Sequence, residues 1–218
     1  MASRNYLVMS EDMTLSDKKG YRLNALSSGL ERCGLKGIGD IEADIPALAS
    51  IPAVNRQDRV QVIHDYIKTG KWPRSIDQRE LQPIQPTDLV AVAAQDSWLT
   101  VALAVGGVVS ALNALAAYQL VVGKLMVCYG VSVESAVVPM PVSRLIFRRG
   151  GAAGNIQAVF DMEPMGVRQI PDAFFSEPVV IDPQEVFAIQ VMGRAVVAAG
   201  TRVHIHNFLL ENTGTVIA

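Results

Sequence analysis

Apolar residues recur with the period of a helix in the first half of the chain. In residues 55–73 they stand three and four positions apart, with charged residues between them: Val60, Ile63 and Ile67. Asn55 precedes the pattern as a capping residue, and Gly70 and Pro73 follow it as stop signals. We therefore expect one amphipathic helix in this segment.

A second helix is expected over residues 16–33. One of its faces carries three leucines, namely Leu23, Leu26 and Leu30. Gly34 is expected to end this helix. The following residues, 34–54, contain glycines and prolines at short intervals, which disfavours long regular elements: Gly34, Gly37, Gly39, Pro46 and Pro52. We interpret this segment as an arm that wraps around another part of a structure.

The pattern changes to a period of two after Tyr118. One face of the segment carries Leu120, Val122, Lys124, Met126 and Cys128. The other face carries Val121, Leu125, Val127, Tyr129, Val131 and Val133. Both faces are largely apolar, so the pattern predicts an extended strand that is covered on both sides.

Further apolar segments follow at the intervals of an antiparallel sheet. They cover residues 142–149, 156–164, 178–182, 183–193, 195–200 and 201–212. The first two are separated by a glycine-rich hairpin turn, and glycine or proline separates the others. Seven or eight short strands of this kind predict a β-sandwich of Greek-key or jelly-roll type.

Charge density divides the chain near residue 96. Residues 1–96 contain 12 basic and 13 acidic residues, whereas residues 97–218 contain 7 and 8. Pro83 and Pro86 precede this change and are typical of an extended connection. We expect a helical and loop-rich N-terminal arm or small domain over 1–96 and a jelly-roll-like β-sandwich over 97–218. The fold class is α+β, mainly β in the C-terminal part.

Composition narrows the classes of function. Half of the 218 residues are apolar, 18% are charged and the net charge is −2. These values exclude a disordered chain and disfavour a basic protein that coats nucleic acid, so we expect no specific nucleic-acid recognition. Cys33 and Cys128 lack the spacing of a zinc site or a disulfide framework, and two unpaired thiols are expected.

Residues 97–123 carry no charge and are long enough to span a bilayer as a helix. Several polar residues and the absence of flanking basic clusters favour a buried segment in a β-rich core or subunit interface instead. The first 20 residues lack the apolar run of a signal peptide, so export by that route is not expected.

The segment that contains His204, His206 and Glu211 resembles the first metal-binding motif of the cupin family, whose barrel is a jelly roll. On a strand the two histidines point to the same face. The resemblance implies that Glu211 completes a site with two imidazoles and one carboxylate. The alternative is that both histidines lie on the exposed face of a terminal strand while Val203, Ile205 and Phe208 face inward.

Catalytic signatures are otherwise lacking. Arg148 and Arg149 precede a glycine turn, a pattern that suits either an anion site or a solvated hairpin tip. The sequence contains no phosphate-binding loop, serine-hydrolase elbow, zinc-protease motif or dinucleotide fingerprint. We therefore predict that the chain is not an enzyme, and we assign no catalytic, cofactor or metal residues.

Sparse charge on a β-sandwich leaves apolar surface, which is typical of permanent assembly. Residues 174–214, which end in Glu211-Asn212-Thr213-Gly214, resemble the closing strands of jelly-roll structural proteins of icosahedral viruses and phages. The resemblance implies a non-enzymatic capsid, minor capsid or cement subunit that assembles into a virion in the host cytoplasm. Its implied partners are copies of itself and other virion structural proteins, which the N-terminal arm would contact. The alternatives are the cupin-like metal protein and a membrane-anchored assembly protein that spans with residues 97–123.

Overall fold

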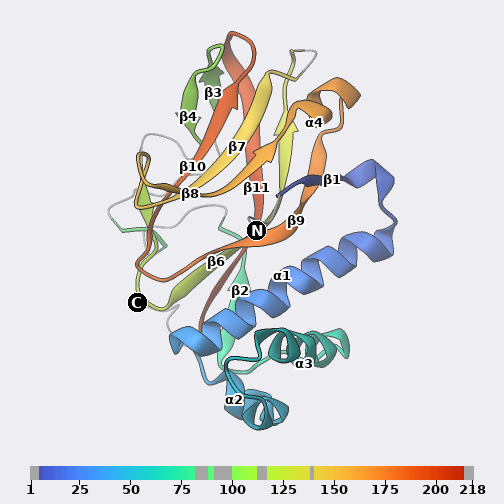
Figure 1. Ribbon diagram of the computed structural model, residues 1–218, viewed down its shortest axis with the longest axis vertical. Helices are drawn as coiled ribbons and strands as arrows, with labels where there is room; N and C mark the ends of the chain where they lie inside the picture. Colours follow the sequence, from blue (N-terminus) through green and yellow to red (C-terminus); the bar gives the residue numbers. More distant parts are fainter. Residues whose placement is uncertain (1–4, 82–87, 91–99, 112–116, 138–139, 214–218) are drawn as a thin grey trace.

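Three layers, two β-sheets and one layer of helices, make up the computed structural model (Figure 1). It describes residues 5–81, 88–90, 100–111, 117–137 and 140–213. Every pairing between the described strands is antiparallel. The chain is therefore α+β with antiparallel sheets, as the sequence predicts.

The helical layer contains α1 (Leu15–Lys36), α2 (Ile41–Asp44), a 3₁₀ turn (Pro46–Ser50) and α3 (Arg56–Lys68). Asn55 is the N-cap residue of α3, so the predicted start of this helix is confirmed. The predicted end of α1 at Gly34 is wrong. The helix continues to Lys36 because Gly37, with φ +69°, is the residue that adopts the left-handed cap.

The first sheet has the strand order β1-β9-β6-β11-β2, and β3 also pairs with β11. Its strands are β1 (Leu7–Met9), β2 (Ile76–Arg79), β3 (Thr100–Leu103), β6 (Lys124–Glu134), β9 (Asp172–Ile181) and β11 (Val197–Asn212). The segments predicted at 195–200 and 201–212 thus form a single strand. Two strands of this sheet, β1 and β2, come from the N-terminal 96 residues.

The second sheet has the order β4-β10-β7-β8, and β5 also pairs with β10. Its strands are β4 (Val108–Ser110), β5 (Tyr118–Gln119), β7 (Val142–Arg149), β8 (Asn155–Asp161) and β10 (Val186–Gly193). Strands β7 and β8 confirm the predicted hairpin. A short helix, α4 (Glu163–Arg168), connects β8 to β9.

Two cores lie on opposite faces of the first sheet. One fills the space between the sheets and includes Met126, Cys128, Val131 and Val133 from β6. The other lies between the first sheet and the helices and includes Leu125, Val127 and Tyr129 from β6, with Phe208 and Leu210 from β11. The prediction that this segment is covered on both sides is therefore confirmed.

The predicted face of Val131 and Val133 is wrong, because β6 carries a bulge. His206 pairs with Gly130 and Asn207 pairs with Cys128, so Tyr129 is an extra residue in the ladder. A bulge exchanges the faces of the residues that follow it. Tyr129 therefore faces the helices, whereas Val131 and Val133 face the second sheet. A side chain at Gly130 would meet the carbonyl oxygen of Ala173 at 2.7 Å, which explains the glycine.

The N-terminal segment packs on the first sheet of its own chain. Helix α1 contacts β6, β9 and β11, and β2 pairs with the end of β11. The predicted boundary at residue 96 lies outside the described residues. Within residues 97–123, the described parts form β3, β4 and β5, whereas the membrane-spanning alternative predicts a helix. No helix in the described parts of the chain combines the length and hydropathy needed to cross a bilayer.

Candidate functional site

The structure does not bring together the three side chains of the predicted metal motif. His204 and His206 lie side by side on β11, with ring centroids 5.2 Å apart. His206 stacks on Tyr129, so both histidines are on the helix-facing side of the first sheet. Glu211 pairs directly with Lys124 and faces the sandwich core, the opposite side of that sheet. These three side chains are therefore unable to ligate one metal ion.

Glu211 belongs to a buried ionic cluster instead. Its carboxylate accepts a hydrogen bond from Arg79 Nε at 2.9 Å and lies 2.9 Å from Lys124 Nζ. Arg79 and Lys124 also contact the buried carboxylate of Asp88. The cluster attaches β2 and residue 88 to β6 and β11, so its role is structural. In the sequence, Lys124 stands among apolar residues on one face of the predicted strand. A lysine at a buried position needs an acidic partner, so this pattern is the signal for the cluster.

Ser132, His206 and Asp172 form a second polar group on the helix-facing side. The Ser132 hydroxyl donates to Asp172 Oδ1 at 2.5 Å, and Ser132 Oγ lies 2.6 Å from His206 Nε2. Because the single hydroxyl proton goes to Asp172, His206 must donate its Nε2 proton to Ser132 Oγ. A histidine in this tautomer is not positioned to activate the serine, since a general base needs a free ring nitrogen there.

Burial lowers the pKa of His206 and of His204 below the ordinary histidine value, because it disfavours the charged imidazolium. His204 adds to the effect on His206, whereas Asp172 and Glu80 oppose it. In the unfolded chain both imidazoles take up a proton near pH 6.5. The unfolded state therefore binds protons first as the pH falls.

We expect thermal stability to fall as the pH decreases from about 6.5 through the lowered pKa values of the folded state. The double variant His204→Gln and His206→Gln is expected to lose less stability between pH 7 and pH 5 than the wild-type chain. Differential scanning calorimetry across this range measures the difference. Parallel curves for the two proteins would contradict the expectation.

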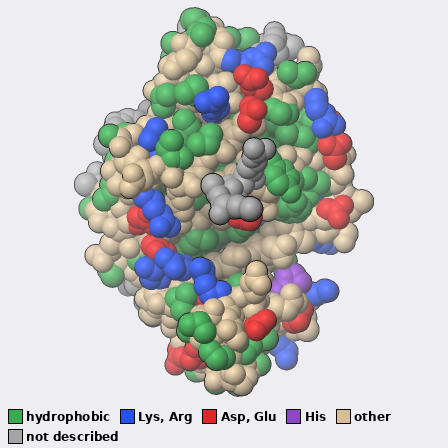
Figure 2. All heavy atoms as spheres, in the orientation of Figure 1, with side chains coloured by type: hydrophobic (Ala, Val, Ile, Leu, Met, Phe, Trp, Pro, Cys, Tyr) green, Lys and Arg blue, Asp and Glu red, His purple; other side chains and the backbone are tan. Residues whose placement is uncertain are grey.

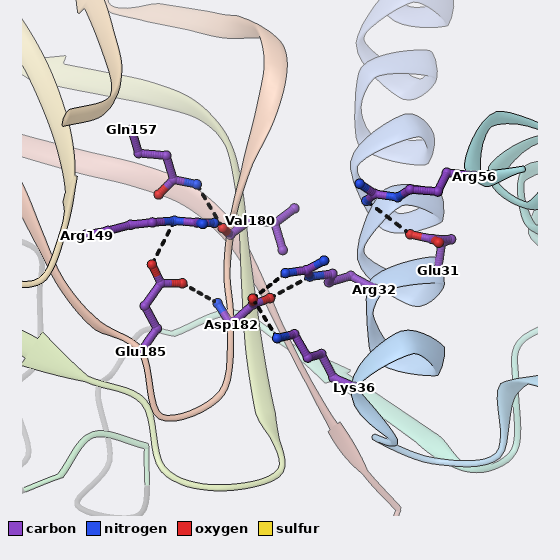
Figure 3. Close-up of polar contacts among 9 residues, drawn as sticks. All are labelled: Glu31, Arg32, Lys36, Arg56, Arg149, Gln157, Val180, Asp182 and Glu185. Atoms are coloured by element: carbon purple, nitrogen blue, oxygen red, sulfur yellow. Dashed lines mark hydrogen bonds and ion pairs between the residues drawn. The ribbon is translucent and has the colours of Figure 1, made fainter. Parts of the chain in front are cut away.

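A pocket of about 350 Å³ lies where the helical layer meets the sandwich, and arginine side chains line it (Figure 3). Arg32 comes from α1, Arg56 from the start of α3 and Arg149 from the end of β7. The remaining lining residues are Gln157, Pro178 and Val180. Figure 2 shows basic side chains, with acidic ones among them, in a band between the sandwich and the helices.

Carboxylates orient these arginines. Arg32 donates from Nε and Nη2 to the two oxygens of Asp182, at 2.7 and 2.5 Å. Arg149 Nε lies 2.8 Å from Glu185, and Arg56 Nη2 donates to the buried Glu31 at 3.3 Å. Burial raises the pKa of Asp182, but hydrogen bonds from Arg32 and Lys36 outweigh it and hold that pKa below its usual range.

The sequence identified only one member of this pocket. Arg149 was weighed as part of an anion site, and the structure places it in the pocket (Figure 3). Its neighbour Arg148 bonds instead to Gln190 and to the carbonyl of Gly154, which stabilises the hairpin turn. Arg32 and Arg56 were missed because they come from elements distant in sequence.

Exposed valines gather at the end of the sandwich that lies farthest from the layer formed by α1, α2 and α3. The turn after β3 carries Val105, 70% exposed, and the turn before β11 carries Val196, 76% exposed. These turns are adjacent, since Gly106 N donates to Gly193 O and Gly193 N donates to Gly107 O. The end of the sandwich therefore presents apolar side chains to solvent.

Two more exposed valines extend this surface. Val167 lies on α4, which Figure 1 places at the same end, and Val137 lies in the connection after β6. Val137 borders a depression of about 370 Å³ that Met140 and Pro171 also line. We call Val105, Val137, Val167 and Val196 the apolar end.

Both cysteines are free and buried, and burial raises the pKa of each thiol. Among the described residues, no group of three or more histidine, cysteine or acidic side chains is arranged to hold a metal ion. Comparison with known proteins found no match to any family model, to any curated protein or to any solved structure.

Proposed function

We propose that this chain is a non-enzymatic structural subunit of a virion, a capsid, minor capsid or cement protein with a jelly-roll sandwich. The observation that carries the proposal is the nesting of its strand pairs. The nesting involves eight of the described strands and leaves out the short strands β1, β2 and β5. In chain order these eight are β3, β4, β6, β7, β8, β9, β10 and β11. The first pairs with the eighth, the second with the seventh, the third with the sixth and the fourth with the fifth.

Nested pairs of this kind are expected when one long antiparallel hairpin folds over into two sheets. The pairs β11 with β6 and β10 with β7 then join the halves of each sheet. An eight-strand double sheet of this connectivity is the jelly roll, which is common in viral capsid domains. The pairing supports this topology. The step from topology to virion function rests on the sequence resemblance.

The apolar end supports assembly through the sandwich. Single exposed valines are ordinary, but Val105 and Val196 lie on adjacent turns, and Val137 and Val167 extend the same end. Burial of such turns against a second copy removes apolar surface from water. We therefore expect copies of this chain to associate through the apolar end.

The double variant Val105→Asp and Val196→Asp tests this surface. Two carboxylates at the centre of an apolar contact are expected to weaken association roughly 10- to 100-fold, because each would be buried unpaired. Sedimentation velocity at micromolar protein concentration measures the shift from large species to small ones.

Val54→Asp is the matched control, since Val54 is 86% exposed in the helical layer, away from the apolar end. It is expected to assemble like the wild-type chain. A wild-type protein that stays monomeric at all salt concentrations would contradict the proposal. An equal effect of the control would show that the apolar end is not the contact.

A further inference from the structure

The arginine pocket has hydrogen-bond donors that its carboxylates do not use. Arg32 donates hydrogen bonds from Nε and Nη2 to Asp182, and Arg56 donates one from Nη2 to Glu31. Arg149 forms an ion pair with Glu185 through Nε. Within the described parts of the chain, the other guanidinium nitrogens of these three arginines have no protein acceptor. Figure 3 shows the three groups on different sides of one gap between the sandwich and α1.

The charged side chains drawn in Figure 3 carry one net positive charge. Among the side chains drawn in Figure 3, Arg32, Lys36, Arg56 and Arg149 are cationic, whereas Glu31, Asp182 and Glu185 are acidic. One positive charge is therefore left over. It lies beside the apolar walls formed by Pro178 and Val180, which reduce the screening of charge by water. These features favour binding of an anion in the pocket.

We propose that this pocket binds a phosphate group. Guanidinium N–H groups are strong donors to phosphate oxygens, and Arg149 retains both of its Nη groups for this role, whereas Arg32 retains Nη1 and Arg56 retains Nε and Nη1. The carboxylates of Asp182 and Glu185 fix the orientation of Arg32 and Arg149, so little side-chain entropy is lost on binding. The ligand is either a small free phosphate or the phosphodiester of a nucleic acid. The proposal stands independently of virion function.

Isothermal titration calorimetry in phosphate-free, low-salt buffer tests the proposal with two probes. One probe is sodium pyrophosphate, and the other is a single-stranded thymidine oligonucleotide. Arg149→Gln and Arg56→Gln are each expected to weaken binding about tenfold or more, because each removes charged donors. Arg149 is 48% exposed, so its substitution is not expected to prevent folding, whereas Arg56→Gln removes the cation paired with the buried Glu31 and is expected to lower stability. Circular dichroism verifies the fold of each variant.

Arg144→Gln is the matched control. Arg144 is exposed on the same strand, β7, and does not line the pocket. It is expected to change binding less than twofold. Binding of pyrophosphate alone identifies a small phosphate as the ligand, and tighter binding of the oligonucleotide identifies nucleic acid. Absence of binding to both probes, or an equal loss in the Arg144 variant, would overturn the proposal.

Discussion

Substitution of Lys124 by methionine is expected to lower the free energy of unfolding by about 3–5 kcal/mol, the cost of breaking a buried ion pair. The side chains of Asp88 and Glu211 are 0% and 1% exposed, and Lys124 Nζ lies 3.1 Å from the first and 2.9 Å from the second. Methionine preserves the length of the side chain but removes its charge. Among the described residues, Arg79 would then be the cation left to pair with these two buried carboxylates.

Urea denaturation followed by circular dichroism measures this loss. Arg202→Gln is the control, because Arg202 forms an ion pair with Glu134 in which both side chains are more than half exposed. Exposed pairs contribute roughly 0–1 kcal/mol, so this variant is expected to unfold close to the wild-type midpoint. A loss of unfolding free energy below about 1 kcal/mol in Lys124→Met would mean that the ionic cluster does not stabilise the fold.

Substitution of Phe208 by alanine is expected to cost about 3–5 kcal/mol. Phe208 is 0% exposed and lies in the core between the first sheet and the helices. Its ring stacks on Tyr129 with centroids 4.6 Å apart, and the guanidinium carbon of Arg22 lies over the Phe208 ring, 5.6 Å from its centroid. Alanine would leave a cavity where the helical layer meets the sheet.

Two further variants make this prediction sharp. Phe208→Leu retains most of the apolar volume and is expected to cost about 1–2 kcal/mol. Tyr6→Ala removes an exposed aromatic ring and is expected to change the free energy of unfolding by less than about 0.5 kcal/mol. Urea denaturation of all three proteins gives the comparison. Equal stabilities for the alanine and leucine variants would show that the helical layer is not packed against Phe208.

Local signals in the sequence predicted the elements that depend on local interactions. The helix after Asn55 has its cap, its apolar spacing and its stop within twenty residues. The hairpin of β7 and β8 has its glycine turn between two apolar segments. The end of α1 was misplaced by three residues because Gly34 and Gly37 are equally suitable stop signals in sequence, and tertiary packing decides between them.

The sequence pattern does not predict features that depend on the register of strand pairing. The bulge at Tyr129 is defined by the pairing of β6 with β11, and strict alternation therefore assigned Val131 and Val133 to the wrong face. The two histidines were correctly placed on one face of a strand, but Phe208 was placed with Val203 and Ile205 and lies instead on the face of the histidines. Glu211 was not excluded from their site, because nothing in the spacing shows that it faces the sandwich core and pairs with Lys124.

The arginine pocket was also beyond local reasoning. Arg32, Arg56 and Arg149 belong to two helices and a strand, and the packing of the helical layer on the first sheet brings them to one pocket. Arg149, next to a glycine turn, is the one pocket arginine that the sequence pattern singles out. Arg32 and Arg56, by contrast, occupy positions that suit any exposed helix surface, so the sequence alone does not distinguish them from solvated charges.

Electron microscopy of the purified wild-type chain tests the proposed assembly most directly. Negatively stained particles at micromolar concentration are expected to be closed and uniform in size, and much larger than one 23.5 kDa chain. A field of dispersed single copies, unchanged when the protein is concentrated, would contradict a role as a shell subunit that builds itself into a virion.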